Sequence, residues 1–358
     1  MIYCRVTADL SKLRDNLGRT AEICHGAGLQ FAAVTKCISG DEKILRVVEE
    51  TDCDMIADSR LQNLAGMRTK KPRFMIRPAQ KWEIPDIPAN AEISFQSEAE
   101  TIGLLGREAA RRGLRHKVVL ACDLGDLREG CFYGDRDDIL KTAEAVVREP
   151  ALELYGVGMN LSCFGGVLPC EENMRGLTEI AAMLRGRFGL PVPVVSGGST
   201  VLIRDLLEGT VVPGINHCRI GELWLAGHDP GRNEDIPGFH TTCFTLEAQL
   251  IEVKEKPSKP IGPIGGDAFG HVIEREDLGT MRRGILACGR QELELDSLIP
   301  LDGRVKILGG SSDHTIVDLS EAPGYRVGDV LTLRMGYGAI LRAWTSRYVE
   351  RRYVGLEA

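Results

Sequence analysis

The chain has 358 residues, of which 43% are hydrophobic, and it carries 44 basic and 51 acidic side chains for a net charge of −7. This size can bury a large core and predicts two domains, or one large barrel with an appendage. The negative charge argues against a nucleic-acid partner, because phosphate binding needs a clustered basic surface. No apolar stretch approaches the roughly 20 residues that cross a bilayer, and residues 1–5 show no signal peptide, so no membrane partner is expected.

Eleven cysteines are scattered along the sequence without a C-x-x-C pair. A structural zinc site needs clustered ligands, so the pattern predicts no metal. Scattered cysteines are typical of reduced core thiols in a reducing compartment. We therefore expect a cytoplasmic protein.

Short apolar runs alternate with amphipathic stretches over the first two-thirds of the chain. The runs, which predict strands, are 31–34, 54–57, 73–76, 92–95, 117–121, 154–159, 192–195 and 217–225. Predicted helices cover 41–50, 59–67, 137–148 and 171–188, and another begins at Ser97-x-x-Glu100, which has the spacing of a capping box. This is the count of a TIM (β/α)8 barrel. The alternative is an open doubly wound sheet, which normally carries a glycine fingerprint that is missing after Val34.

The pattern changes near Phe239, where the helical spacing ends. Strands are predicted at 245–253, 285–287, 305–308, 315–319 and 330–335, between glycine and proline turns. Residues 254–260 are expected to be a solvated loop. We therefore expect a barrel domain over 10–236 and a C-terminal β-rich domain over 237–358, with which residues 1–9 could pack.

Lys36 ends the first predicted strand. It would then lie at the C-terminal mouth of a barrel, where the active sites of such barrels are found. A desolvated lysine can lose its proton and form a Schiff base with a carbonyl compound. Taken alone, a lysine that extends into water is the more ordinary interpretation.

A run of small and hydroxyl residues, Ser196-Gly197-Gly198-Ser199-Thr200, follows the seventh predicted strand. Glycines let the backbone approach an anion, and free amides and hydroxyls donate to it. Phosphate sites in these barrels often follow strands seven and eight. The run predicts a phosphate loop, and an ordinary capped loop remains the alternative.

Arg219 lies within the eighth predicted strand. A permanent charge inside an apolar strand needs a partner. Two partners are plausible, namely an ion pair with Glu222 or Asp205, or a hydrogen bond to a cofactor.

Three further segments could contact a substrate or cofactor. Residues 123–130 place four charges beside two glycines after the fifth strand, and their Arg128 could fork onto a carboxylate. Asn160 at the end of the sixth strand could face a ring. Residues 265–271 and 311–314 are turn-like, and the latter could present a base.

Together these features resemble the alanine racemase-like family of pyridoxal-phosphate (PLP) enzymes, which combine a barrel, a C-terminal β domain and a Schiff-base lysine after the first strand. Ala33-Val34-Thr35-Lys36 resembles the lysine motif, and Arg219-Ile220-Gly221 resembles a second phosphate segment whose arginine meets the pyridine nitrogen. The resemblance implies that PLP is held by Lys36, Asn160, Ser196, Gly197, Gly198, Ser199, Thr200, Arg219, Gly221 and Glu222. It further implies that Arg128, Asp126 and Ser312 bind an amino-acid substrate.

Longer segments resemble the branch of this family that racemises ornithine. They are 57–64, 123–130, 195–198, 267–270, 311–314 and 334–338. The resemblance implies interconversion of L- and D-ornithine or a similar basic amino acid, for whose side chain Asp126, Glu129 and Asp58 are candidate partners. An alanine or broad-specificity racemase is the alternative. A decarboxylase ranks lower because Arg219 stands where a carboxylate is expected, and a non-catalytic PLP carrier because it would resemble the barrel alone.

Racemisation needs acid/base groups on both faces of the substrate, and Lys36 is one of them. The resemblance implies that the C-terminal domain supplies the other to a neighbouring subunit, and hence a homodimer with shared active sites. The resemblance also implies that residues 265–270 stand in place of the family's Ser-Tyr-Gly motif with its catalytic tyrosine. We expect Asp267 to be the second base, with Asp313 and His314 as competitors.

Overall fold

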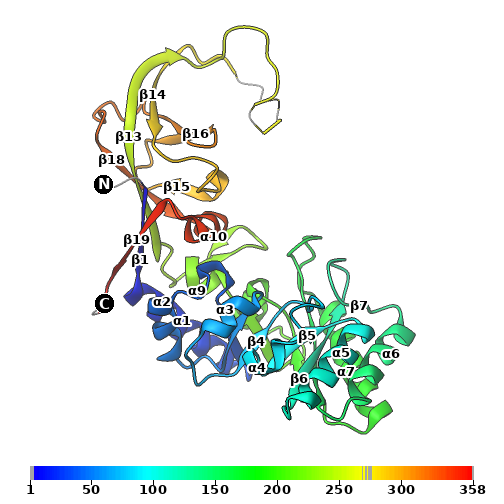
Figure 1. Ribbon diagram of the computed structural model, residues 1–358. Coiled ribbons are helices and arrows are strands. Elements are labelled where there is room, and N and C mark those ends of the chain that lie inside the picture. The colour runs from blue at the N-terminus through cyan, green and yellow to red at the C-terminus, as the bar shows by residue number, and fades with distance from the viewer. Residues whose placement is uncertain (1–3, 268, 271, 273–275, 357–358) are drawn as a thin grey trace. The chain divides into compact units, whose positions relative to one another are not determined.

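The computed structural model describes residues 4–267, 269–270, 272 and 276–356. The chain divides into two compact units (Figure 1). One is Leu13–Phe239, and the other combines Met1–Lys12 with His240–Ala358. Among the described residues, none of the helices is long and apolar enough to cross a membrane.

Eight parallel strands form a closed sheet in the first unit. In sheet order they are β5 (Ile93–Gln96), β4 (Arg73–Met75), β3 (Met55–Asp58), β2 (Gln30–Val34), β10 (His217–Ile220), β9 (Val194–Ser196), β8 (Leu152–Met159) and β6 (His116–Asp123). The pairing of β5 with β6 closes the sheet, and a short β7 (Cys131–Phe132) extends β6. The predicted TIM barrel is confirmed, and the closure excludes the open doubly wound sheet.

Helices follow the strands and lie outside the sheet (Figure 1). They are α1 (Leu10–Gly26), α2 (Glu42–Glu49), α3 (Leu61–Gly66), α4 (Ile87–Asn90), α5 (Ala99–Arg111), α6 (Arg136–Val147), α7 (Glu171–Phe188), α8 (Ile203–Glu208) and α9 (Glu222–Ala226). A two-stranded ribbon of β11 (His228–Asp229) and β12 (Glu234–Asp235) follows α9.

Two sequence expectations in this unit are wrong. The capping box at Ser97 is not formed, because α5 begins one position later and its N-cap, Glu98, makes no side-chain cap bond. The eighth strand ends at Ile220 rather than residue 225, since residues after Gly221 form α9. That helix buries four consecutive apolar side chains, and a short helix buried all round has the same apolar pattern as a buried strand.

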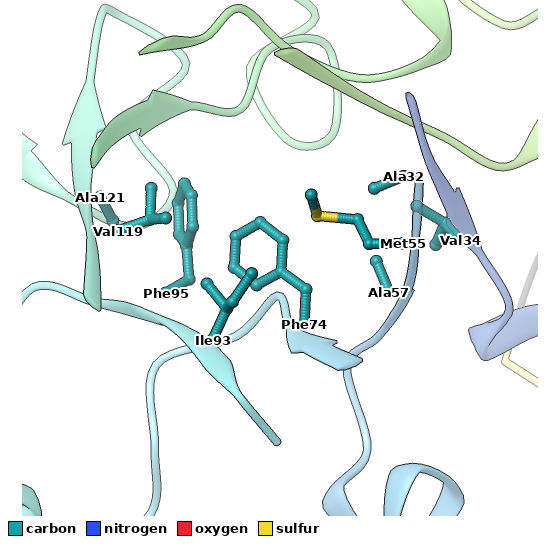
Figure 2. Close-up of a cluster of buried hydrophobic side chains, with 9 residues drawn as sticks. All are labelled: Ala32, Val34, Met55, Ala57, Phe74, Ile93, Phe95, Val119 and Ala121. Carbon is teal, nitrogen blue, oxygen red and sulfur yellow. The ribbon is translucent and has the colours of Figure 1, made fainter. Parts of the chain in front are cut away.

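The interior of the barrel is filled by side chains of β2 to β6 that point toward one another (Figure 2). They are Ala32, Val34, Met55, Ala57, Phe74, Ile93, Phe95, Val119 and Ala121. Members of one strand are two residues apart, because successive side chains point to opposite faces. The rings of Phe74 and Phe95 lie 6.0 Å apart, so the barrel is a packed core rather than a pore.

The second unit is a mainly antiparallel sheet. Its strands are β1 (Cys4–Asp9), β13 (Phe244–Pro257), β14 (Thr280–Leu286), β15 (Leu298–Pro300), β16 (Lys306–Gly310), β17 (Thr315–Asp318), β18 (Val330–Met335) and β19 (Val349–Val354). The order is β15-β18-β13-β14-β17-β16, and β1 lies between β13 and β19 (Figure 1). A helix that the sequence did not predict, α10 (Tyr337–Thr345), precedes β19.

The expectation of a solvated loop at residues 254–260 is also partly wrong. The segment as far as Pro257 continues β13 and pairs with residues 280–283 of β14. The charged residues of this stretch suggested a solvated loop. A strand with exposed side chains tolerates such residues, because only its backbone groups form the hydrogen bonds to the neighbouring strand.

Candidate active site

Lys36 lies two residues after the end of β2 and begins a 3-10 turn, Lys36–Ile38, at the C-terminal end of the barrel strands. The residue before it is fixed to the next strand, because the Thr35 N–H donates to the Ala57 carbonyl at 2.8 Å and its hydroxyl donates to Asp58 at 3.0 Å. The Lys36 side chain is half-buried. The backbone that carries Lys36 is thus held at the C-terminal end of β2.

Asp58, the last residue of β3, is fully buried beside this lysine. Its carboxylate accepts the Arg60 N–H at 2.8 Å and both oxygens face Nδ2 of Asn63 at 3.2 Å. Burial raises the pKa of the Asp58 carboxyl, and these hydrogen bonds and the Lys36 charge oppose the shift. The sequence analysis named Asp58 only as a possible substrate partner. The sequence signal for its role in holding the turn after β3 was a carboxylate at a strand end, followed by polar residues two and five positions later.

Arg219 of β10 points into the barrel and is only 2% exposed. It donates to the Ser196 hydroxyl, to the Met159 carbonyl at 2.6 Å and to Oδ1 of Asn160 at 2.7 Å. Burial lowers the pKa of the Arg219 guanidinium to about 10, so it is a cation at neutral pH. Within the described part of the chain no carboxylate pairs with it, and the ion pair with Glu222 or Asp205 is not found. Its charge is held by neutral acceptors.

His217, two residues earlier on the same face of β10, was missed by the sequence analysis. Its Nδ1 lies 2.7 Å from the Ser196 hydroxyl and its Nε2 lies 3.4 Å from the Met55 sulfur. Burial and the nearby Arg219 charge lower the pKa of the imidazole to about 3, so the ring is neutral. The i, i+2 spacing from Arg219 was the available signal. Ser196 therefore holds both side chains in place.

The glycine loop between β9 and α8 is shaped by its neighbours. The Gly197 N–H donates to the His217 carbonyl, and the Gly198 carbonyl accepts the Arg219 N–H, both at 2.9 Å. A Cβ at Gly197 would lie 2.6 Å from Cγ2 of Ile215, and Gly198 has φ +139°. Both positions therefore require glycine. The hydroxyl of Thr200 accepts the Gly221 N–H at 3.3 Å, which connects this loop to the start of α9.

Lys36, the glycine loop and Arg219 thus come together at the C-terminal ends of β2, β9 and β10. These strands are neighbours, because β10 pairs with both of the others. A primary amine, an anion-binding loop and a buried cationic donor are the groups that would hold the aldehyde, the phosphate and the ring nitrogen of PLP. The residues present therefore fit that cofactor.

Glu222 begins α9 directly after Gly221 and is half-buried. Burial raises the pKa of its carboxyl to about 7; His228 opposes the shift and Asp229 adds to it. Its charge also raises the pKa of the buried Cys37 thiol, after the larger effect of burial. Glu222 therefore lies near the turn that carries Lys36.

The loop after β6 places Arg128 beside its own neighbour. Arg128 forks onto the Glu129 carboxylate, with Nη2 at 2.6 Å from Oε1, and Nδ2 of Asn160 donates to the same carboxylate. Since Asn160 also contacts Arg219, this loop joins the barrel site. The sequence analysis expected Arg128 to fork onto a substrate carboxylate, and in this structure the adjacent Glu129 carboxylate occupies that fork.

Asp126 has a different environment from the one expected for a substrate residue. It is 1% exposed, and its two oxygens accept the N–H groups of Ser162, Phe164, Gly165 and Val167 at 3.0–3.3 Å. These four bonds hold the 162–167 loop against the loop after β6. Because the carboxylate is already satisfied, we do not assign Asp126 to the substrate.

The remaining expected residues form a second group in the C-terminal unit. Asp267 is half-buried, accepts the Phe269 N–H at 2.8 Å, and lines a cavity of about 910 Å³ together with Ser311 and Arg290. The Ser312 hydroxyl donates to Asp313 at 2.7 Å, and the Ser311 oxygen lies 3.4 Å from Nδ1 of His314. Asp313 and His314 are exposed in this turn.

Comparison with known proteins gives consistent results along the whole chain. The family described as "Alanine racemase, N-terminal domain" matches residues 8–226. Ornithine racemase of Acetoanaerobium sticklandii is 40% identical over 98% of this chain and 99% of that protein. Lysine racemase of Thermotoga maritima is 32% identical over 99% of both.

Solved structures share the fold at low sequence identity. Alanine racemase of Streptomyces coelicolor superposes with a TM-score of 0.72 at 18% identity, covering 98% of both chains. D-threo-3-hydroxyaspartate dehydratase of a Delftia species gives a TM-score of 0.71 at 16% identity, covering 96% of this chain and 92% of that one. Since these neighbours include a racemase and a dehydratase, the fold by itself does not select the reaction.

Proposed function

The chain belongs to the alanine racemase family, and we propose that it interconverts L- and D-ornithine with PLP held on Lys36. One observation carries the proposal: Lys36, the glycine loop and Arg219 end the adjacent strands β2, β9 and β10. Ornithine is favoured by the 40% identity to ornithine racemase, and a basic substrate by the 32% identity to lysine racemase.

Different residues of the barrel have different roles in the proposed reaction. PLP, when bound, stabilises negative charge at the α-carbon of an amino acid. Lys36 would hold the cofactor, and its Nζ would take or return the α-proton on one face of the substrate. Arg128 binds the substrate carboxylate through its fork. The loop of residues 196–200 binds the phosphate, with Gly221 and Thr200 fixing its shape.

Arg219 would donate a hydrogen bond to the ring nitrogen of the cofactor and so leave that nitrogen unprotonated. A guanidinium gives up its proton only at strongly basic pH, so it donates a hydrogen bond and transfers no proton. An unprotonated ring would be a weaker electron sink, which would favour removal of the α-proton over transamination. Ser196 and Asn160 orient the guanidinium for this bond.

The opposite face of the substrate is assigned to the C-terminal unit of a second copy of this chain, so the active sites of a homodimer are shared. Asp267 is our choice for the second base, because it lines a cavity among Gly265 and Gly266, where small residues allow close approach. Asp313 and His314 compete for this role, and Ser312 is placed near the substrate. A cytoplasmic location is supported by the eleven cysteine residues, of which nine are buried.

Incubation of the purified protein with PLP and L-ornithine in deuterated water tests the proposal. We expect optical rotation to fall to zero while deuterium enters the α-position, and kcat/KM for ornithine to exceed that for alanine at least tenfold. Each tenfold preference corresponds to about 1.4 kcal/mol of transition-state binding. Borohydride reduction and peptide mapping should place the label on Lys36. Better turnover of alanine, or a label elsewhere, contradicts the proposal.

A further inference from the structure

A hydrogen-bonded chain of side chains runs from the barrel interior to the substrate loop. Arg219 donates to Oδ1 of Asn160 at 2.7 Å, Nδ2 of Asn160 donates to Glu129, and Glu129 is paired with Arg128. The side chains of Arg128 and Glu129 are 34% and 19% exposed. The pair is therefore partly desolvated, and a charge left unpaired there costs more than it would on the surface.

We propose that Glu129 selects substrates with a distal ammonium group by exchanging ion pairs with them. This inference rests on the proposed function, in which Arg128 binds the α-carboxylate. Since Glu129 occupies the Arg128 fork, an incoming carboxylate must displace it. Glu129 then loses its cation and keeps the Asn160 amide. An ornithine-like substrate supplies a new cation from its side chain, and alanine does not.

Three other carboxylates near the barrel mouth are already satisfied. Asp126 accepts four backbone N–H groups, and Asp58 accepts from Arg60, Asn63 and Thr35. Asp123 accepts the N–H groups of residues 125 and 127 at 2.9 and 3.1 Å. Glu129 differs from all three, because its main partner is the cation that the substrate would take. It therefore becomes available at the moment of binding.

The exchange of ion pairs predicts that Glu129 favours substrates with a charged side chain and disfavours those with a neutral one. A substrate with two charges of opposite sign replaces one ion pair with two, so the net number of unpaired charges does not rise. A substrate with a neutral side chain breaks the pair and leaves Glu129 uncompensated, which disfavours it. Glu129 thus repels the wrong substrate as well as attracting the right one.

Glu129→Gln tests this directly, with Glu98→Gln as the matched control. Glu98 is exposed and lines the same cavity of about 520 Å³ as Arg128 and Glu129, so its variant removes an equal charge nearby. We expect Glu129→Gln to lower the ornithine-to-alanine ratio of kcat/KM at least tenfold, mainly through better use of alanine. Glu98→Gln should leave the ratio within twofold. Glu129→Asp, which keeps the charge, should retain a preference for ornithine.

Binding without turnover gives a second readout. In enzyme reduced with borohydride, no amine can exchange with the cofactor, so 5-aminopentanoate (ornithine without its α-amine) and pentanoate report the carboxylate and ammonium contacts alone. Calorimetry should show tighter binding of 5-aminopentanoate by at least tenfold in the wild type and in Glu98→Gln, and equal binding in Glu129→Gln. Equal weakening of both ligands, or an unchanged substrate ratio, would overturn the role of Glu129. Failure of the wild type to take up PLP or to racemise ornithine would instead contradict the proposed function.

Discussion

The Thr35 hydroxyl donates a hydrogen bond of 3.0 Å to Oδ2 of Asp58, across the neighbouring strands β2 and β3 and directly before Lys36. The other oxygen of this buried carboxylate accepts the Arg60 N–H. One side chain therefore fixes both the end of β2 and the turn after β3. The backbone that carries Lys36 is held by a satisfied buried acceptor rather than by loop packing.

Replacing this acceptor should destabilise the barrel. We expect Asp58→Asn to lower the free energy of unfolding by about 1–3 kcal/mol, because the new amide presents a donor where three donors converge. Thr35→Val, which removes one hydroxyl, should cost about 1 kcal/mol. Urea denaturation of the PLP-free proteins at pH 7 measures both. Equal stability of Asp58→Asn and the wild type would show that the network contributes nothing.

Glu222 should make stability depend on pH. Burial raises the pKa of its carboxyl to about 7, above the ordinary value of 4.5. The folded state thus binds this proton more tightly than the unfolded state, so the contribution to stability is present below about pH 4.5 and is lost as the pH rises through 7. Relative to Glu222→Gln, the wild type should lose up to about 3 kcal/mol over this window. Urea denaturation of both PLP-free proteins at pH 5 and pH 8 measures the difference, and a constant difference would contradict the prediction.

His217 should act in the opposite direction. Its pKa is lowered to about 3 by burial and by Arg219, so the unfolded chain binds this proton more readily. The neutral ring therefore contributes stability above about pH 6.5, which is lost as the pH falls toward 3. The free energy of unfolding falls as the pH is lowered, and we expect His217→Gln to reduce this fall by up to about 4 kcal/mol. His116, whose burial lowers its pKa to about 4, is the matched control: His116→Gln should remove a separate part of the same fall. An unchanged fall in both variants would mean that other groups govern acid unfolding.

The strand ends were accessible to sequence analysis because they depend on local patterns. Apolar runs located the eight barrel strands, and the residues that follow two of them, Lys36 and Ser196, were placed at the mouth for that reason. Closure of the barrel depends on β5 meeting β6, a contact that no single segment encodes. The identity of the residues at strand ends can thus be predicted from local sequence. The pairing of β2, β9 and β10, which brings these residues together, cannot.

Several contacts of the expected site residues could not be read from the sequence. Asp126 was expected to face a substrate, and its four donors come from residues 162–167, some 36 to 41 positions away. The fork of Arg128 is filled by the next residue, which composition alone cannot distinguish from a solvated charge. His217 and Arg219 share Ser196 of another strand. Asp126, His217 and Arg219 each depend on a partner that only the folded chain brings near.

The glycine loop gives a prediction specific to phosphate. We expect Gly197→Ala to weaken binding of PLP at least tenfold, about 1.4 kcal/mol, because the new Cβ would lie 2.6 Å from Ile215 and displace the loop. Pyridoxal, which lacks the phosphate, serves as the control ligand. Its affinity should change by less than twofold. Equilibrium dialysis of the two ligands measures the ratio, and an equal loss for both would indicate general damage to the site.

The second base is tested by measuring hydrogen exchange from each enantiomer separately. Lys36 and the second base act on opposite faces, so loss of the second base should abolish α-deuterium exchange from one enantiomer and spare the other. General bases contribute about 10²–10⁴-fold, and we therefore expect Asp267→Asn to lower exchange at least 100-fold on one side only. Asp313→Asn and His314→Gln test the competing assignments, since both side chains belong to an exposed turn of the same unit. They should leave exchange from both enantiomers within a few-fold of the wild type.

If Asp267 instead binds the distal ammonium, its variant should weaken the binding of both enantiomers of ornithine alike and leave the binding of small neutral amino acids unchanged. That result, or one-sided loss in Asp313→Asn or His314→Gln, would move the base to the turn of residues 311–314.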